Sequence, residues 1–458
     1  MKRYEEYKES GVKWIGKVPS HWNYSRIKFG LKSSFSGVWG DDEKGDDNDI
    51  VCYRVADFDY KNGGLSEEKI TIRNIDEKTF KEREILPNDI LIEKSGGGDV
   101  NPVGRAVIAN LAHRATCSNF IHCVRCNENA LNTRLLYYFF YSIYAQKVNL
   151  LFFNQTTGIQ NLKIPDYLGQ IIFLPPLSEQ QSIASFLDGK TKPIDAIISK
   201  REKQIELLEE MKSAIISRAV TKGLNPNAKM KDSGIEWIRE IPTNWESLRV
   251  KDVITLLTDY DANGSFADIA ANVHVNIGNP YAWMVRATDL ANDRCGLVDG
   301  NNYCDEDTYN YLSKSSLCPG DVLIAKRGDI GKSYIVPNCD CPMTLAPNTY
   351  LLKTDKKMID NMFFHYFFMS DYGKKQLTIN NKSTTIGAIY KDDVKNLRLL
   401  LPPKKEQLQI VSYLDAETSK IDARIAKRRR QIELLQEYKQ ALITDAVTGK
   451  IDVRGFNA

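Results

Sequence analysis

Two stretches of this sequence repeat one another and decide the fold. Residues 174–221 read LPPLSEQQSIASFLDGKTKPIDAIISKREKQIELLEEMKSAIISRAVT, and residues 401–448 read LPPKKEQLQIVSYLDAETSKIDARIAKRRRQIELLQEYKQALITDAVT. They align without a gap at an offset of 227, and 28 of the 48 positions are identical. Agreement of this kind does not arise by chance, so the chain contains an internal duplication.

The duplication extends over almost the whole chain. Lys8–Trp22 (KESGVKWIGKVPSHW) matches Lys231–Trp245 (KDSGIEWIREIPTNW). Between these ends the similarity is faint but keeps its order, with Arg54–Asp57 beside Arg286–Asp289, Pro87–Ile92 beside Pro319–Ile324, and Val103–Arg105 beside Ile330–Lys332. Each half is a variable globular block followed by a well-matched helical block. A repeat this long is no solenoid, whose units span about 20–50 residues, and it predicts pseudo-two-fold symmetry.

The matched blocks predict helices. A short helix is expected near residues 178–188 and a long one near 192–221, with Thr191 and Thr418 as N-caps and Pro193 in a first turn. Apolar residues recur at spacings of three, four or seven: Ile194, Ile198, Ile205, Leu208 and Ile215, and then Ile421, Ile425, Ile432, Leu435 and Leu442. Such a stripe is typical of a coiled-coil-like seam. We therefore expect the two long helices to pack on each other, antiparallel if the halves are related by a two-fold axis.

The variable blocks combine short strands with helices. Residues 89–92 and 321–324 follow Pro-Asn and Pro-Gly turns and predict strands. Residues 131–144 and 358–372 predict aromatic-rich helices. The expected fold is α+β, with two globular α/β domains separated by the two long helices. The predicted boundaries are 1–176 and 230–403 for the globular domains, and 177–229 and 404–458 for the helical regions.

Composition narrows the class of protein. The 458 residues are 42% hydrophobic, and 62 basic against 59 acidic side chains leave a net charge of +3. These figures exclude a mainly disordered chain and a polycationic one, but local positive charge could still contact nucleic acid. No apolar run approaches the roughly 20 residues that span a bilayer. The polar start and nine cysteines without framework spacing predict a cytoplasmic protein with free thiols and no membrane partner.

The sequence offers no convincing catalytic or metal site. Gly328–Ser333 resembles a phosphate-binding loop, but it has two residues where that loop has four, so we interpret it as a turn before a strand. Cys123 and Cys126 with His113 and Cys117 suggest zinc, yet residues three apart on a strand face opposite sides, which favours a structural role. Asp89 with Glu93-Lys94 faintly suggests a nuclease, and the second copy lacks the set. We therefore expect no catalytic residue, no metal and no cofactor in this chain.

Taken together, these features resemble the specificity subunit of type I restriction–modification enzymes. The resemblance rests on the two Leu-Pro-Pro segments that lead into long helices, on QIELL at 204–208 and 431–435, and on the Ser-Gly-x-x-Trp-Ile openings after Ser10 and Ser233. It implies two target-recognition domains, each of which reads one half of a split, asymmetric site in double-stranded DNA. It also implies that the helices set the gap and hold two modification subunits, with restriction subunits added for cleavage. S-adenosylmethionine, ATP and Mg²⁺ would belong to those partners.

A length estimate agrees with the role that the resemblance implies. A helix of 30 residues is about 45 Å long. One turn of B-DNA is roughly 34–36 Å. Two readers at the ends of such helices could therefore meet one face of a duplex about a turn apart.

Polar loops are the candidates for DNA contact. Residues 94–98 and 326–328 are basic and glycine-rich and could approach phosphates, whereas residues 154–161 and 380–385 carry amides and hydroxyls that can read base edges. The predicted DNA contacts are Lys94, Ser95, Gly97, Asn154, Gln155, Thr157, Gln160, Lys326, Arg327, Asn380, Lys382 and Thr384. The predicted partner-binding seam is Ile194, Ile198, Ile205, Leu208, Ile421, Ile425, Ile432 and Leu435. The alternative for each loop is ordinary exposure to solvent.

Three other functions stay open at this point. The chain could be a nuclease or methylase that acts alone, although the motifs for either are missing. It could be a helical assembly protein that does not read bases. It could also be a specificity protein of another phage-defence system.

Overall fold

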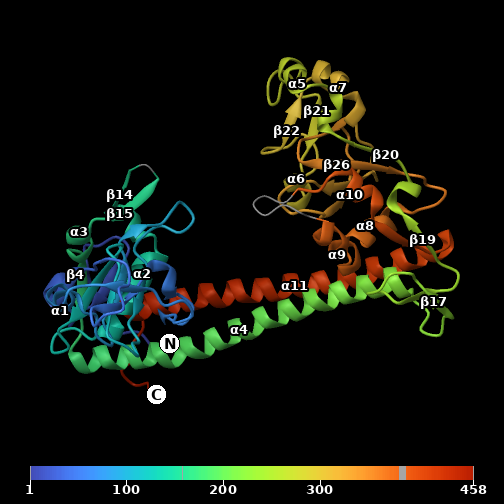
Figure 1. The fold of residues 1–458 in the computed structure, drawn as a ribbon. Helices are drawn as coiled ribbons and strands as arrows, with labels where there is room; N and C mark the ends of the chain where they lie inside the picture. The colour runs from blue at the N-terminus through green and yellow to red at the C-terminus, as the bar shows by residue number, and fades with distance from the viewer. Residues whose placement is uncertain (1, 157, 381–387, 457–458) are drawn as a thin grey trace. The chain divides into compact units, whose positions relative to one another are not determined.

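The computed structural model describes residues 2–156, 158–380 and 388–456. It forms two compact units: unit 1 comprises residues 1–203 and 428–458, and unit 2 comprises residues 204–427. Each unit combines one globular block with segments of both long helices, α4 (Leu177–Lys222) and α11 (Lys404–Val447) (Figure 1). Because the units divide both helices, the four sequence-based boundaries stay a prediction.

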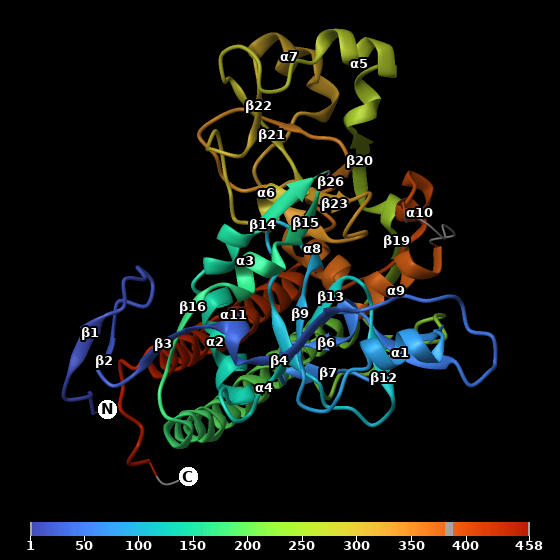
Figure 2. The same cartoon turned by 90° about the vertical axis from the view of Figure 1, so that its left-hand side faces the viewer.

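Unit 1 is organised around a four-stranded antiparallel sheet of order β11-β9-β13-β4 (Figure 2). A second sheet has the order β12-β5-β8, in which β12 and β5 are parallel. These strands are β4 (Leu31–Ser36), β5 (Asp49–Tyr53), β8 (Ile72–Asn74), β9 (Ile90–Glu93), β11 (Ala106–Ile108), β12 (Ala115–Cys117) and β13 (Ile121–Cys126). All four residues of β9 are buried, as expected for a central strand covered on both faces.

The remaining elements of unit 1 surround these sheets. They are β1 (Tyr7–Glu9), β2 (Lys17–Pro19), β3 (Asn23–Arg26), β6 (Phe58–Asp59), β7 (Gly64–Leu65), α1 (Glu77–Arg83), β10 (Ser95–Gly96), α2 (Thr133–Ala145), β14 (Phe153–Thr156), β15 (Ile159–Leu162), α3 (Ile164–Leu168) and β16 (Ile171–Leu174). The aromatic helix α2 packs in one core with β9 and with the end of α11, which contributes Leu442 and Ile443. Its predicted helical character is confirmed, and its buried side chains belong to the core.

Unit 2 repeats this topology strand for strand. Its four-stranded sheet has the order β24-β23-β26-β20, and its three-stranded sheet has the order β25-β21-β22, again with one parallel pair. The strands are β20 (Ile254–Asp259), β21 (Ala282–Val285), β22 (Asn302–Cys304), β23 (Val322–Ala325), β24 (Ser333–Ile335), β25 (Met343–Leu345) and β26 (Thr349–Thr354). The predicted strands near 89–92 and 321–324 are confirmed as β9 and β23.

The other elements of unit 2 follow the same plan with local differences. They are β17 (Met230–Asp232), β18 (Glu240–Pro242), β19 (Glu246–Arg249), α5 (Phe266–Asn272), α6 (Ala287–Ala291), α7 (Glu306–Tyr311), α8 (Asn361–Met369), α9 (Asp371–Asn380), α10 (Lys391–Asn396) and β27 (Arg398–Leu401). The single helix predicted over 358–372 is instead two helices, because Ser370 is extended and its Oγ donates to the carbonyl of Phe367.

The two long helices contact each other in both units, and the contacts are repeat-equivalent. In unit 1, Lys439 Nζ lies 2.6 Å from Asp195 Oδ1. In unit 2, Lys212 Nζ lies 2.7 Å from Asp422 Oδ1. Asp422 is the repeat equivalent of Asp195, and Lys439 is the repeat equivalent of Lys212. The aspartate of each helix therefore contacts the lysine of the other helix, as equivalent residues do across an isologous interface. The start of each helix meets the end of the other, which confirms antiparallel packing.

The helical block is continuous where the sequence suggested a break. A short helix, a break and a long helix were predicted, but α4 is one helix of 46 residues with Pro193 in its interior. Thr191 and Thr418 are therefore not N-caps; Thr191 contacts the hydroxyl of Tyr138, and Thr418 Oγ1 donates to the carbonyl of Leu414. Burial of side chains on both sides of Pro193 offsets the helical hydrogen bond that proline removes.

The predicted seam is buried most deeply near the globular blocks. Ile194, Ile198, Ile421 and Ile425 are buried. The other predicted members, Ile205, Leu208, Ile432 and Leu435, are half-buried. The stripe thus packs as an apolar seam, while its role in binding a partner stays a prediction.

Candidate nucleic-acid interface

The most strongly repeated motif of the sequence forms a junction between globular block and helix. In unit 1 the Glu179 carboxylate accepts hydrogen bonds from Trp22 Nε1 at 3.0 Å and from the Tyr4 hydroxyl at 2.7 Å. His21 Nε2 lies 2.8 Å from its second oxygen. Because Glu179 is only 6% exposed, these bonds compensate the cost of burying a charge.

Unit 2 builds the same junction from the repeat mates. Glu406 accepts from Trp245 Nε1 at 3.0 Å and from Asn244 Nδ2 at 3.0 Å. Asn244 takes the place of His21, and unit 1 has Tyr4 as an additional donor, so the copies agree in the tryptophan bond and differ in the other donors. The matched tryptophan and glutamate therefore serve the framework of each unit.

The glutamine that follows the glutamate is also structural. Gln180 accepts from the backbone N–H of Asn132 at 2.9 Å and donates to the carbonyl of Pro175 at 3.0 Å. Gln407 makes the equivalent bonds to Asp360 and Pro402, at 2.7 and 2.9 Å. Identical residues in the two copies thus hold the helix start against the preceding domain.

In unit 1 the structure brings two predicted contact loops together. Residues 94–98 and 154–161 are about 60 positions apart, but β10, β15 and β14 form one three-stranded sheet in that order. Ser95 pairs with Asn161, and Gln155 pairs with Gln160. The hairpin and the glycine-rich loop therefore form one continuous surface, named here the β10–β14 surface.

The individual predicted residues fall into two groups on this surface. Ser95 and Gln160 are buried; Ser95 Oγ donates to Asn161 Oδ1 at 2.7 Å, and Gln160 Oε1 accepts from the backbone N–H of Val103 at 3.2 Å. Their bonds hold the sheet together.

Asn154, Gln155 and Gly97 are exposed. Lys94 is half-buried, and its Nζ donates to Ser36 Oγ at 3.2 Å. Thr157 lies outside the described residues. DNA contact stays a prediction for all of these residues, and the exposed ones are placed to make it.

A pocket of about 490 Å³ lies against the β10–β14 surface. Its lining includes Trp39, Arg54, Phe120 and the Ser95–Gly97 segment. Phe120 is 44% exposed and Trp39 is 37% exposed. Asp57 holds the Arg54 guanidinium in place through Nε at 3.2 Å and Nη2 at 2.9 Å.

Sequence reasoning did not identify Trp39, Arg54 or Phe120 as candidates. Arg54 was noticed only as part of a faint repeat match, and nothing in a sequence distinguishes the exposed Phe120 from a core aromatic. The signal was present for Arg54, because an arginine three residues before an aspartate recurs at Arg286 and Asp289. There too the pair is close, with Arg286 Nη2 at 2.6 Å from Asp289 Oδ1.

The buried floor of this pocket is one place where the two units differ chemically. Glu93 lines the pocket, and burial raises the pKa of its carboxyl, an effect opposed by Arg105 at 3.1 Å. Arg105 also stacks on the ring of Tyr60, 3.8 Å from its centroid. In the matching ladder of unit 2 the corresponding residue is Ala325. The two units therefore share the strand framework around this position but differ in the side chain that it carries.

In unit 2 the lysine of the predicted loop at 326–328 is paired with acidic side chains. Lys326 Nζ lies 3.1 Å from Asp259 and 2.8 Å from Asp261, and Lys391 Nζ lies 2.7 Å from Asp259. Burial raises the pKa of the Asp259 carboxyl, but hydrogen bonds from Lys391 and Lys326 outweigh it and bring the pKa below its usual value. Lys326 is thus engaged within the unit, whereas Arg327 is exposed.

The second predicted segment of unit 2 is only partly described. Arg327 forms a β-bridge with Ala388, so the chain returns to the 326–328 loop as the hairpin does in unit 1. Lys382 and Thr384 lie outside the described residues. Asn380 ends α9, and its side chain also lies outside the described part. DNA contact by these residues stays a prediction.

The motifs that suggested other chemistry have structural roles. The turn after Gly328 leads into β24, as interpreted from the spacing. Cys117, Cys123 and Cys126 are buried thiols in the strands of unit 1. Within the described ranges, no group of three or more His, Cys, Asp or Glu side chains is arranged to hold a metal ion. The helices of the same ranges include none that is long and apolar enough to cross a membrane.

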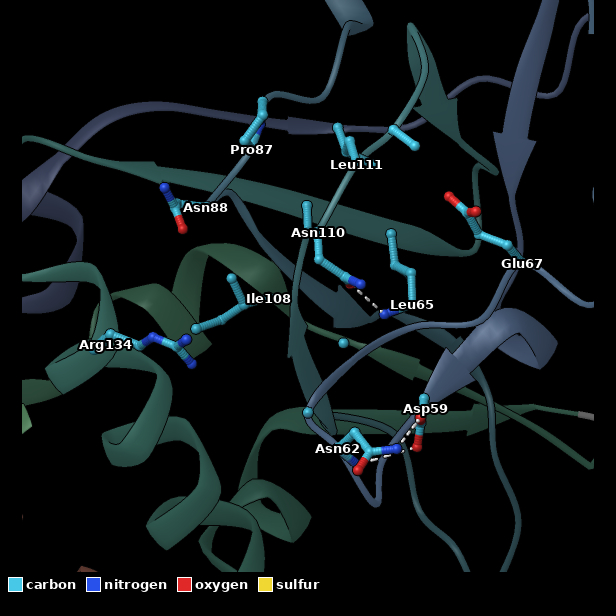
Figure 3. Close-up of a pocket in the computed structure, with 14 residues that line it drawn as sticks. Asp59, Asn62, Leu65, Glu67, Pro87, Asn88, Ile108, Asn110, Leu111 and Arg134 are labelled. Carbon is cyan, nitrogen blue, oxygen red and sulfur yellow. Dashed lines mark hydrogen bonds between the residues drawn. The ribbon is translucent and has the colours of Figure 1, made fainter. Parts of the chain in front are cut away.

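A larger pocket of unit 1, of about 780 Å³, is polar but internally bonded (Figure 3). Asn62 Nδ2 donates to Asp59 Oδ2 at 2.6 Å, and Asn110 Oδ1 accepts from the backbone N–H of Leu65 at 2.7 Å. These bonds fix the β6–β7 turn against the segment after β11. The chemistry of this pocket is that of a turn framework.

Known proteins resemble this chain over most of its length. The family described as "Type I restriction modification DNA specificity domain" matches residues 41–207 and 242–434. The chain is 26% identical to the type I restriction enzyme MjaVIII specificity subunit of Methanocaldococcus jannaschii, over 98% of each chain. It is 23% identical to the EcoKI specificity subunit of Escherichia coli, over 81% of this chain and 76% of that one.

A solved structure supports the fold. It comes from a study of complex assembly and conformational transition of the type I R-M system, and it covers 95% of this chain and 99% of its own with a TM-score of 0.66 at 16% identity. Both halves of the chain match the same family in tandem, as the internal duplication requires. The chain therefore belongs to the type I restriction–modification DNA specificity family, whose members are non-catalytic DNA-recognition subunits.

Proposed function

We propose that this chain reads a bipartite, asymmetric DNA site for a type I restriction–modification complex, with one half-site for each unit. The observation that carries the proposal is the contrast between matched junctions and unmatched surfaces. Glu179 and Glu406 each accept a hydrogen bond from the matched tryptophan, whereas Glu93 faces a pocket where unit 2 has Ala325. Two domains that join the helices in the same way but expose different pocket residues suit the recognition of two different half-sites.

In unit 1 the reading surface is the β10–β14 surface with its adjoining pocket. Asn154 and Gln155 can form paired hydrogen bonds with adenine edges in the major groove. The exposed ring of Phe120 offers an apolar contact for a thymine methyl group. The backbone at Gly97, which has a φ of +60°, can approach a phosphate closely because no side chain intervenes.

A double substitution of Asn154 and Gln155 by alanine tests this assignment. Loss of one bidentate base contact is expected to cost about 1–3 kcal/mol, or roughly 5- to 150-fold in affinity for the cognate duplex. The measurement is fluorescence anisotropy with the assembled complex, at one fixed salt concentration. Asn129→Ala is the matched control, because Asn129 is exposed at the opposite end of β13 from Phe120. Unchanged affinity of the double variant would remove these residues from the interface.

Exchange of the whole first block tests the modular reading. Replacing residues 1–176 by the corresponding block of a relative should change one half-site and leave the other. The readout is a single-molecule methylome of cells that carry the chimera together with its partner subunits. If both half-sites change together, the units do not read independently.

The partners follow from the same repetition. Leu207 and Met211 are about half exposed on α4, four residues apart on one helix face, and their repeat mates Leu434 and Tyr438 are about half exposed on α11. Two equivalent apolar patches would bind two copies of one partner, the modification subunit. S-adenosylmethionine, ATP and Mg²⁺ would be bound by the modification and restriction subunits.

Native mass spectrometry of the assembled complex tests these patches. Leu207→Glu and Leu434→Glu should each remove one modification subunit, and the double variant should remove both. Each single variant is the control for the other. Retention of two modification subunits by the double variant would place the partner elsewhere.

A further inference from the structure

Three thiols of unit 2 gather where two loops meet at the edge of a core. Cys339 Sγ and Cys341 Sγ lie 3.1 Å apart. Cys295, which follows α6, is within hydrogen-bonding reach of Cys339, and its Sγ lies 3.5 Å from the carbonyl oxygen of Asn338. Both Cys339 and Cys341 pack against the core of Trp283 and Leu323, so this core and the short Cys-Asp-Cys segment hold the two sulfur atoms together.

The cluster is accessible, unlike most thiols of this chain. Cys295 is exposed, and Cys339 and Cys341 are intermediate. By contrast, the thiols of Cys52, Cys117, Cys123, Cys126 and Cys304 are buried. A small oxidant can therefore reach the cluster without unfolding unit 2.

The cluster is also particular to one half of the duplication. β25 is the counterpart of β12, since each pairs in parallel with the equivalent strand of its sheet. Counting back from these strands, Leu111 and His113 of unit 1 stand where unit 2 has Cys339 and Cys341. Leu111 packs against a core as Cys339 does, so the fold needs an apolar residue there and has no need of a pair of thiols.

We propose that Cys339 and Cys341 are a reversible redox pair, oxidised to a disulfide by peroxides. The two thiols lose two protons and two electrons and form one S–S bond, while hydrogen peroxide is reduced to two molecules of water. The sulfur atoms need to approach by about 1 Å, because a disulfide bond is about 2.05 Å long. A thiol reductant returns the pair to its free form by exchange. This proposal does not depend on DNA recognition, so its test and the test of the proposed function can succeed or fail separately.

The cluster favours this pair over the alternative pairing with Cys295. Cys339 and Cys341 are two residues apart in one short segment, so the backbone itself keeps their sulfur atoms close. Cys295 belongs to a different loop, and its thiol stays close to Cys339 only while the two loops remain packed together. Burial raises the pKa of the Cys341 thiol to about 11, so this thiol keeps its proton at neutral pH. Formation of the disulfide is therefore expected over minutes to hours, within the known range for such reactions.

Peptide mapping of the full chain tests the proposal. The protein is treated with hydrogen peroxide, free thiols are blocked with iodoacetamide, and tryptic peptides are analysed by mass spectrometry. Cys339 and Cys341 share the tryptic peptide 333–353, and Cys295 lies in the separate peptide 295–314. The expected result is a peptide 333–353 that carries no alkyl group and has lost two hydrogen atoms. When dithiothreitol is added after the peroxide and before the iodoacetamide, the same peptide should carry two alkyl groups.

Two matched variants complete the design. Cys341→Ser should abolish the loss of hydrogen from peptide 333–353, and Cys318→Ser, which removes another exposed thiol, should leave it unchanged. Full alkylation of both thiols after peroxide would overturn the proposal. A cross-link between peptides 295–314 and 333–353 would also overturn it, because Cys339 or Cys341 would then be paired with a cysteine of the other peptide, Cys295 or Cys304. Circular dichroism of each variant checks that unit 2 is folded.

Discussion

The buried carboxylate of Glu179 offers a sharp test of the framework. It accepts hydrogen bonds from Trp22 and Tyr4, and His21 lies beside its second oxygen. All three donors come from the first 22 residues, and Glu179 is in the first turn of α4. The substitution Glu179→Ala therefore removes the main polar link between the start of the chain and the first long helix.

The expected cost follows from the donors left behind. Trp22 is 1% exposed and Tyr4 is 5% exposed, so water cannot replace the lost acceptor. An unsatisfied buried donor costs about 1–3 kcal/mol, which gives about 2–6 kcal/mol for the two. In a domain of 150–250 residues, 1 kcal/mol shifts the Tm by about 2–4 °C. The melting transition of unit 1 should fall by roughly 4–24 °C.

The assay is differential scanning calorimetry, with hydrogen exchange to assign each transition to its unit. Glu179→Gln is the first control; it keeps the shape and one acceptor oxygen and should lose less stability than Glu179→Ala. Glu406→Ala is the second control. Glu406 is half-exposed and accepts from two donors, Trp245 and Asn244, so its loss should cost less and should affect unit 2.

Two outcomes would refute this reasoning. One is a unit 1 transition within about 1 °C of the wild type in Glu179→Ala, which would mean that the buried donors find other partners. The other is a larger loss for Glu406→Ala than for Glu179→Ala. In that case burial would not govern the cost of the missing acceptor.

Two further predictions concern charge. Asp195→Lys should destabilise unit 1, and adding Lys439→Asp should restore part of the loss, with a coupling of about 1 kcal/mol because both groups are only partly exposed; a double-mutant cycle with no coupling would contradict the ion pair. Stability of both units should fall as the pH drops from about 6.5 to about 4, because burial lowers the pKa of His122 and of His365 to about 4 while the unfolded chain binds a proton near 6.5. Replacing both histidines by asparagine should flatten this decline in urea melts, and an unchanged slope would show that other groups cause it.

The repeat and the elements next to it were predictable because they rest on local signals. The 28 identities at one offset established the duplication, and the 3.6-residue periodicity established the long helices. The strands β9 and β23 follow Pro-Asn and Pro-Gly turns, which can be recognised from two adjacent residues. The interpretation of Gly328–Ser333 as a turn was also sound, because loop spacing is itself a local property.

The failures occurred where contacts distant in sequence outweigh local preference. Pro193 and Thr191 favour a helix start in isolation, but burial on both sides keeps α4 continuous through them. Ser370 divides one predicted helix into two. Ser95 and Gln160 were chosen as candidate DNA contacts from their type alone; the structure buries both in the β10–β15 pairing, and their contact with DNA stays a prediction. Phe120 gave no signal, since exposure of an aromatic residue depends on neighbours far along the chain.

The sequence by itself determined that two copies of one plan exist and that each copy ends in a long amphipathic helix. It also supported the family, because two tandem sets of motifs in order are specific. Only the tertiary structure decided which matched residues serve the framework, since Glu179 and Trp22 are 157 positions apart and meet only when the helix start packs on the domain. It likewise decided that residues 94–98 and 154–161 form one surface, because strand pairing depends on hydrogen bonds between distant segments.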